Sequence, residues 1–250
     1  MPSSDTQPLL EPDDRQRWFT TTHWSVVLSA RESSPHATAA LETLCRTYWP
    51  PLYTYIRRRG HDTHHAQDLT QAFIAHLLAQ DFLGRVSRDQ GKFRSFLLAS
   101  LNNFLVNEHE RAGAQKRGGS LAFVPLAAND AEEWLCAEPS ATETAEDIFD
   151  RRWALTLLER AFARVRGEFE AAGKLTQFEC LKNFLEGDVG HGDYNGAARE
   201  LRMSAGAVAV AVHRLRQRYR ETLRREIAET VGSPEQVDDE LRDLQAILSR

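Results

Sequence analysis

Apolar residues recur at helical spacing through most of this 250-residue chain, and that periodicity restricts the fold more than any other feature. In segment 63–80, Leu69, Phe73 and Leu77 repeat every four residues, and a similar stripe runs through segment 93–112. Such repeats place side chains on one face of an α-helix, whereas a half-buried strand alternates every second residue. Strand alternation of useful length is absent from the sequence, which therefore predicts an all-α protein.

Two further helices are predicted ahead of these segments. One begins near Thr22, where three threonines can cap a helix. The other covers segment 37–58, but it contains Pro50 and Pro51. Proline lacks a backbone donor and clashes with the preceding turn, so we expect that helix to kink or break there.

The helical pattern lapses in the middle of the chain, which predicts two helical domains joined by an acidic, flexible linker. Residues 127–150 hold eight acidic residues and no Lys or Arg; Pro139 lies among them, and Gly118, Gly119 and Pro125 precede them. That composition is typical of a tether. The predicted division is a disordered lead over 1–19, a helical domain over 20–117, a linker over 118–150, a helical domain over 151–231 and an acidic tail over 232–250.

The net charge of −5 conceals two basic segments. Residues 85–117 carry seven Lys or Arg against three acids, and residues 194–231 carry eight Arg against four Glu. A phosphate backbone responds to such local patches, so the charge distribution favours a nucleic-acid partner in spite of the overall charge.

Sites for chemistry are weakly indicated. His61 and His65 share a helical spacing but lack further ligands nearby, so no metal is expected. Cys180 with His191 lacks a third orienting group for nucleophilic catalysis. No catalytic residue, cofactor, small-molecule substrate or membrane span is predicted, and three distant cysteines favour reduced thiols in a cytoplasm.

The strongest local signal is a helix-turn-helix pattern. A first helix over 194–201 is expected to cross the second closely at Ala198, with Leu201 buried, and Ser204 is expected to cap the second helix. Arg202 stands in the turn where glycine is common. On the second helix, one face is apolar and is predicted to be buried: Val208, Ala211, Val212, Leu215 and Tyr219. The other face is rich in donors, as required in a DNA major groove: Ala209, Val210, His213, Arg214, Gln217 and Arg220. An ordinary helical hairpin with a solvated arginine face is the alternative.

Several motifs in fixed order give a more specific signal: TTHWSVVL, LCRTYWPPLYTYIRRRGH, AQDLTQAFIAHLL, GKFRSFLLASLNNFL, RRWALTLLE and GAVAVAVHRLRQRYRETLRREIAETV. With these motifs the chain resembles the extracytoplasmic-function sigma factors of bacterial RNA polymerase. The likeness is greatest to a long-tailed branch found in planctomycete-type bacteria. It covers most of residues 20–230.

The resemblance implies that the protein performs no chemistry, binds core RNA polymerase and promoter DNA, and has an anti-sigma factor as a candidate partner. The implied polymerase-binding residues are Asp68 and Gln71. The implied contacts with the minus-ten element are Lys92, Arg94, Asn102, Asn103, Arg111, Lys116 and Arg117. The implied contacts with the minus-thirty-five element are Ser204, Val210, His213, Arg214, Gln217 and Arg220.

Two other readings remain open. The chain can be a stand-alone helix-turn-helix regulator that never touches polymerase, although the 63–80 helix argues against it. It can also be a sigma relative that has lost DNA binding. Ala209 favours that reading, because the family often has a polar residue there.

Overall fold

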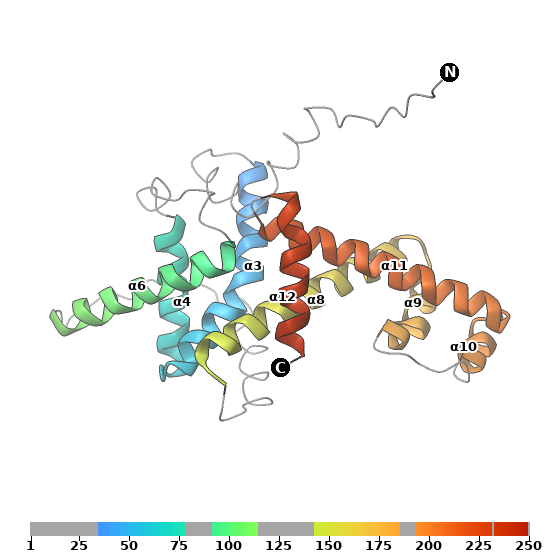
Figure 1. Ribbon diagram of the computed structural model, residues 1–250, viewed down its shortest axis with the longest axis horizontal. Helices are drawn as coiled ribbons and strands as arrows, with labels where there is room; N and C mark the ends of the chain where they lie inside the picture. Colours follow the sequence, from blue (N-terminus) through green and yellow to red (C-terminus); the bar gives the residue numbers. More distant parts are fainter. Residues whose placement is uncertain (1–34, 79–91, 115–142, 186–193, 232, 250) are drawn as a thin grey trace, which may run out of the picture. The chain divides into compact units, whose positions relative to one another are not determined.

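The computed structural model describes residues 35–78, 92–114, 143–185, 194–231 and 233–249, and every regular element in these ranges is helical (Figure 1). The elements are α3 (Pro35–Arg58), α4 (Thr63–Leu78), α6 (Phe93–Ala114), α8 (Ala145–Ala171), α9 (Leu175–Leu181), η2 (Lys182–Leu185), α10 (Tyr194–Glu200), α11 (Ala205–Thr230), η4 (Pro234–Gln236) and α12 (Val237–Leu248). The all-α prediction is confirmed. Among the described helices, none has the length and apolar character needed to cross a membrane. The helix expected near Thr22, the lead and most of the linker lie outside the described residues.

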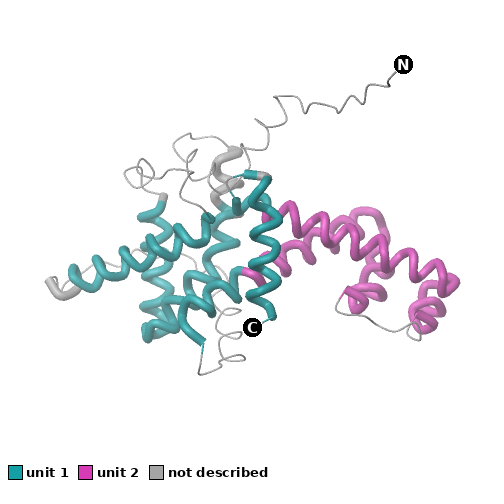
Figure 2. The backbone as a smooth tube through the Cα atoms, in the orientation of Figure 1, with its two compact units in different colours: residues 1–153, 228–250 teal, residues 154–227 magenta. Residues whose placement is uncertain are grey.

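The chain divides into two compact units (Figure 2). Unit 1 comprises residues 1–153 and 228–250, and unit 2 comprises residues 154–227. The predicted division differs at one point in particular. The sequence predicts a separate acidic tail over 232–250, whereas the structure includes that segment in unit 1.

Unit 1 has a core made by the predicted apolar stripes. Leu69, Phe73 and Leu77 of α4 are buried, and α4 packs against both α3 and α6. The ring of Phe73 lies 5.5 Å from the ring of Phe104 of α6. Aromatic pairs at this spacing add to the free energy gained by burial. The periodicity of these segments therefore identifies the buried faces of α4 and α6.

The expected kink or break at Pro50 and Pro51 does not interrupt α3, which is assigned as one helix of 24 residues. Both prolines are buried in the helix, next to Trp49 and Leu52. The hydroxyl of Thr54 donates to the Pro50 carbonyl at 2.6 Å. An interior proline costs about 3 kcal/mol, but each large apolar side chain that is fully buried returns about 1.5–3 kcal/mol. Packing of the helix outweighs the local cost.

The end of the predicted linker is ordered as the first turns of α8. Thr144 and Asp147 form a reciprocal cap: the Asp147 amide donates to the Thr144 hydroxyl at 3.1 Å, and the Thr144 amide donates to the Asp147 carboxylate at 3.3 Å. This pairing satisfies two amides that the start of a helix leaves without partners. Ile148 and Phe149 follow at once and are buried in unit 1. Residues 143–150 are therefore part of unit 1, because a cap and an apolar pair fix them there.

The tail helix α12 buries Val237, Glu240, Leu244 and Ile247, which recur at intervals of three and four residues. That spacing places all four on one face of the helix. Asp238 and Asp239 lie on the exposed side. The tail is thus an amphipathic helix of unit 1, with one carboxylate set among three apolar side chains.

Two helices end in the same way with different residues. At the end of α8, the Lys174 amide donates to the Phe169 carbonyl at 2.8 Å, and Gly173 has a φ of 68°. At the end of α10, the Met203 amide donates to the Ala198 carbonyl at 2.9 Å, and Arg202 has a φ of 53°. This left-handed cap normally carries glycine, which alone adopts it without a Cβ penalty. The sequence-based expectation that Arg202 occupies a glycine-type position is confirmed.

Exchanging the two residue types is expected to move stability in opposite directions. Arg202→Gly is expected to raise the free energy of unfolding of unit 2 by about 0.5–1 kcal/mol, because glycine adopts the left-handed backbone conformation at this position without the steric cost of a Cβ atom. Gly173→Ala is expected to lower it by about 1 kcal/mol, because the added methyl group meets no atom within 4 Å and only the backbone is strained. Urea unfolding of both variants measures the two shifts. Shifts of the same sign would contradict the assignment of a shared cap.

Candidate nucleic-acid interface

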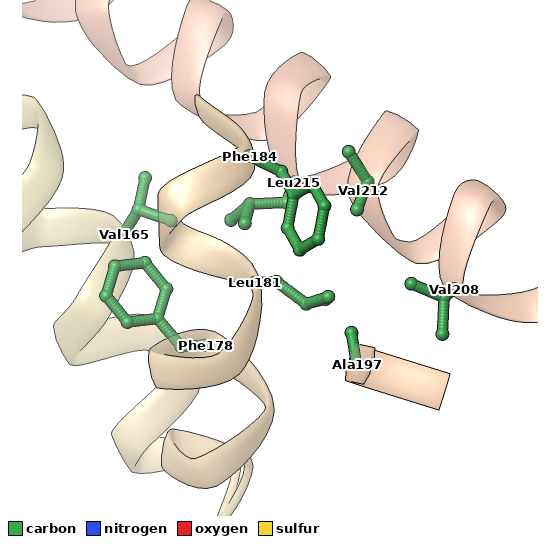
Figure 3. Close-up of a cluster of buried hydrophobic side chains, with 8 residues drawn as sticks. All are labelled: Val165, Phe178, Leu181, Phe184, Ala197, Val208, Val212 and Leu215. Atoms are coloured by element: carbon green, nitrogen blue, oxygen red, sulfur yellow. The ribbon is translucent and has the colours of Figure 1, made fainter. Parts of the chain in front are cut away.

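Unit 2 fixes α11 through a compact apolar cluster. Val208, Val212 and Leu215 of α11 are buried in one core with Leu181 and Phe184 (Figure 3). Ala211 and Tyr219 pack against the same core but remain partly exposed. The predicted apolar face is therefore the packed face of α11, and the opposite face is left for solvent or a partner.

The short helix α10 precedes α11 and contributes a small side chain to this core. The buried alanine is Ala197, at 6 % exposure, while Ala198 and Leu201 are only partly buried. The most buried alanine of α10 thus lies one residue before the predicted position, and Leu201 is less buried than predicted. Ser204 caps α11 as predicted, since its hydroxyl accepts the Ala207 amide at 3.2 Å.

The residues predicted to contact the minus-thirty-five element are all exposed: Ser204, Val210, His213, Arg214, Gln217 and Arg220. Val210 is 50 % exposed, so its apolar side chain is accessible to a partner. Gln217 donates to Glu221 at 3.1 Å along the same face. Ala209 is partly buried beside this face. These exposed residues, called the exposed stripe of α11 below, thus offer cations, an amide and one apolar group on a helix whose other side is packed.

Not every arginine of α11 is available for a partner. Arg218 forms a two-pronged pair with Glu168, with both nitrogen–oxygen distances at 2.7 Å, and this hydrogen bonding lowers the pKa of Glu168. Arg216 donates to the Phe184 carbonyl at 2.9 Å. In the described part of the chain, Arg214 and Arg220 form no ion pair. Within these ranges, no carboxylate therefore neutralises the charges of the two arginines predicted to contact DNA.

An open groove of about 640 Å³ runs beside this stripe within unit 2. Its lining includes Phe169, Met203 and Val210, with Lys174 and Arg214 also present. The apolar residues of this lining can contact a thymine methyl group and its cations can contact phosphate, while Glu168 adds a carboxylate to the same groove.

The predicted polymerase-binding residues lie on α4 of unit 1. Asp68 is exposed and Gln71 is partly exposed, while Ala66, Leu69 and Phe73 are buried against the rest of the unit. An exposed carboxylate on a rigid, packed helix suits a partner that presents basic side chains.

The residues predicted to contact the minus-ten element separate into two sets. Asn103 is exposed on α6, as is Arg111, which pairs with Glu108 at 2.9 Å near the surface. Asn102 is partly buried, and its side-chain oxygen lies 2.7 Å from the Tyr55 hydroxyl. That hydroxyl also lies 2.9 Å from Glu146. Burial, followed by the hydrogen bond to Glu146, raises the pKa of Tyr55. Lys116 and Arg117 lie outside the described residues.

Lys92 and Arg94 are the residues for which the structure differs most from the expected exposed DNA contact. Arg94 is 7 % exposed, and its Nε lies 2.8 Å from Glu240 Oε1 and its Nη2 lies 2.8 Å from Asp243 Oδ2. Its third nitrogen, Nη1, donates to Asp150, and the guanidinium lies 4.7 Å from the centre of the Trp153 ring. All three guanidinium nitrogens of Arg94 are therefore hydrogen-bonded to carboxylates of unit 1.

Lys92 belongs to the same cluster. Its ammonium nitrogen lies 2.8 Å from Glu240 Oε2 and also donates to Asp243. Burial opposes ionisation of Asp243, but the hydrogen bond and charge of Lys92 and the charge of Arg94 hold its pKa below the usual value. The sequence contains a signal for this cluster, because Glu240 falls on the apolar face of the tail helix. Its partners cannot be named from that signal.

The features that suggested chemistry remain isolated. The rings of His61 and His65 lie 4.9 Å apart, yet the described residues contain no group of three or more side chains suited to a metal ion. Burial raises the pKa of the Cys45 thiol and of the Cys180 thiol, which disfavours the nucleophilic thiolate. His191 lies outside the described residues.

Comparison with known proteins adds no assignment: no protein family, no curated protein and no solved structure matches this chain.

Proposed function

We propose that this protein is an alternative sigma factor of the extracytoplasmic-function type, which binds core RNA polymerase and directs it to promoters. In this proposal α10 and α11 form a helix-turn-helix that reads the minus-thirty-five element. Asp68 and Gln71 of α4 bind polymerase, and α6 contacts the minus-ten element. The protein carries out no catalysis and acts in the cytoplasm.

One observation carries the proposal: α11 is packed through its apolar face and exposes Arg214, Gln217 and Arg220 on the other. A recognition helix needs this division, because it must be held rigidly while its outer side chains reach base edges. The order of motifs that resembles sigma factors then favours promoter recognition over a solvated arginine face. The exposed carboxylate on α4 favours a polymerase partner over a regulator that acts alone.

Arginines at two positions of α11 are expected to differ in effect. Arg214→Ala is expected to weaken promoter binding by about 1–3 kcal/mol and to relax preference at particular base pairs. Arg220 is expected to lie nearer the DNA backbone, so Arg220→Ala is expected to weaken binding to all promoter sequences alike. Promoter selection by each variant with core polymerase, from a pool of duplexes with randomised upstream elements, measures both effects.

A variant in unit 1 supplies the matched control. Asn103→Ala on α6 is expected to slow strand opening and to leave upstream preference unchanged, while neither α11 variant impairs opening of a pre-melted template. If Arg214→Ala left every promoter preference unchanged, α11 would be a packing element with a solvated face. Sequence-specific binding of nanomolar affinity by the isolated protein would instead favour the stand-alone regulator.

A further inference from the structure

The tail helix α12 places two carboxylates on the two cations at the start of α6. Glu240 and Asp243 are separated by three residues, so both project from the same side of α12. Each of them contacts both Lys92 and Arg94. Four ion pairs therefore join one short segment of the tail to one short segment of α6.

Lys92 and Arg94 have the chemistry of a phosphate site. A guanidinium offers paired donors that match two oxygens of a phosphate, and an ammonium adds a point charge. A carboxylate presents two oxygens and a negative charge, so it can satisfy the same donors. Glu240 and Asp243 therefore stand where the phosphates of a nucleic acid strand would bind.

The two carboxylates of α12 differ in their exposure to water. Asp243 remains 44 % exposed, so water already reaches this edge of the cluster. Glu240 is 1 % exposed, and a buried ion pair gains little net stability because both charges lose hydration. A phosphate that replaces these carboxylates restores the charge balance of Lys92 and Arg94 while the carboxylates return to water.

We propose that α12 is an internal competitor of nucleic acid: its docked form occupies Lys92 and Arg94, and a DNA strand must displace it to bind there. This inference rests on the proposed function, since it takes the start of α6 as a DNA-binding surface. The proposed competition gives a reason why the acidic tail pairs with Lys92 and Arg94, two predicted DNA contacts of the same unit. The free protein is held in a state that binds DNA weakly at α6, and displacement of α12 opens the site.

The test uses the full chain and a fluorescent single-stranded oligonucleotide of about 20 nucleotides. Asp243→Asn removes one charge that contacts both cations and leaves Glu240 and Asp150 to hold Arg94. We expect binding to tighten roughly tenfold at moderate salt.

Asp239→Asn is the matched control. It removes the same charge from the same helix, but Asp239 lies on the exposed side and pairs with Arg242 of α12 itself. Its affinity is expected to stay within twofold of the unaltered protein. Adding Lys92→Gln to Asp243→Asn is expected to abolish most of the gain in affinity, because that gain depends on the basic side chains at the start of α6 that become free to bind phosphate.

Amide hydrogen exchange of the unaltered protein tests displacement without any substitution. Saturating oligonucleotide is expected to speed exchange over 237–248, whereas a tail with a purely structural role would keep its protection. Unchanged protection, or equal affinities for Asp243→Asn and Asp239→Asn, would overturn the proposed competition even if DNA binds elsewhere. Absence of binding by every variant, with polymerase as well as without it, would overturn the proposed function itself.

Discussion

Replacing Arg94 by methionine is expected to lower the free energy of unfolding of unit 1 by about 3–5 kcal/mol, because it breaks a buried ion pair and leaves Lys92 alone to compensate Glu240 and Asp243. The side chain of Arg94 is 9 % exposed and that of Glu240 is 1 % exposed, so solvent screens the lost attraction poorly. Asp150 of α8 also loses its partner, whether or not α12 is docked. Methionine keeps part of the apolar stem, so packing on Trp153 changes less than the charge does.

Urea unfolding followed by tryptophan fluorescence measures this loss. Arg111→Met is the matched control, because Arg111 is on the same helix and pairs with Glu108 at 73 % side-chain exposure. An exposed pair of this kind contributes about 0.5 kcal/mol or less. If the two variants unfolded at the same urea concentration, the cluster around Arg94 would not be a stabilising feature of unit 1.

The second large effect concerns polymerase. Asp68→Arg is expected to weaken binding of core RNA polymerase by about 1–3 kcal/mol, a loss of roughly 5- to 150-fold, because a cation then faces a basic partner. The residue is exposed, so the change leaves the packing of α4 intact. Titration of labelled protein with core polymerase gives the two affinities.

Glu42→Arg provides the same reversal of charge elsewhere in unit 1. Glu42 is exposed on α3, where it pairs with Arg46 at 2.6 Å. Its affinity for polymerase is expected to stay within about twofold of the unaltered protein, since exposed charges far from an interface are screened by salt. Equal losses for both variants would point to overall charge rather than to α4 as the interface.

The sequence predicts the helices of this protein well because their signals are local. The stripe of Leu69, Phe73 and Leu77 identifies the buried side of α4, and Ser204 correctly marks the start of α11. Arg202 is also predictable, since a turn of this kind requires a left-handed residue whatever its side chain. Errors of phase are small, as with Ala197 in place of Ala198.

The ion cluster of unit 1 could not be predicted because it joins residues that are distant along the chain. Arg94 contacts Asp150 and Glu240, which lie 56 and 146 residues away. In the sequence, a basic residue beside an aromatic-rich helix has the pattern of a DNA contact. The pattern is the same whether the partner of that residue is a phosphate or a carboxylate of the same chain. Only the amphipathic spacing of Val237, Glu240 and Leu244 hints that the tail is packed. Helix periodicity therefore reports which residues are buried, and tertiary pairing decides which cations remain available.

Transcription by purified core RNA polymerase tests the central claim most directly. The template is a pool of promoter-sized duplexes with randomised sequence, and run-off transcripts are collected with and without the full-length protein. The proposed function predicts transcripts that depend on the protein and share two sequence blocks, and Asp68→Arg is expected to reduce their yield. If no transcript depended on the protein while it bound duplex DNA tightly by itself, the sigma-factor assignment would be contradicted and a stand-alone regulator would be favoured.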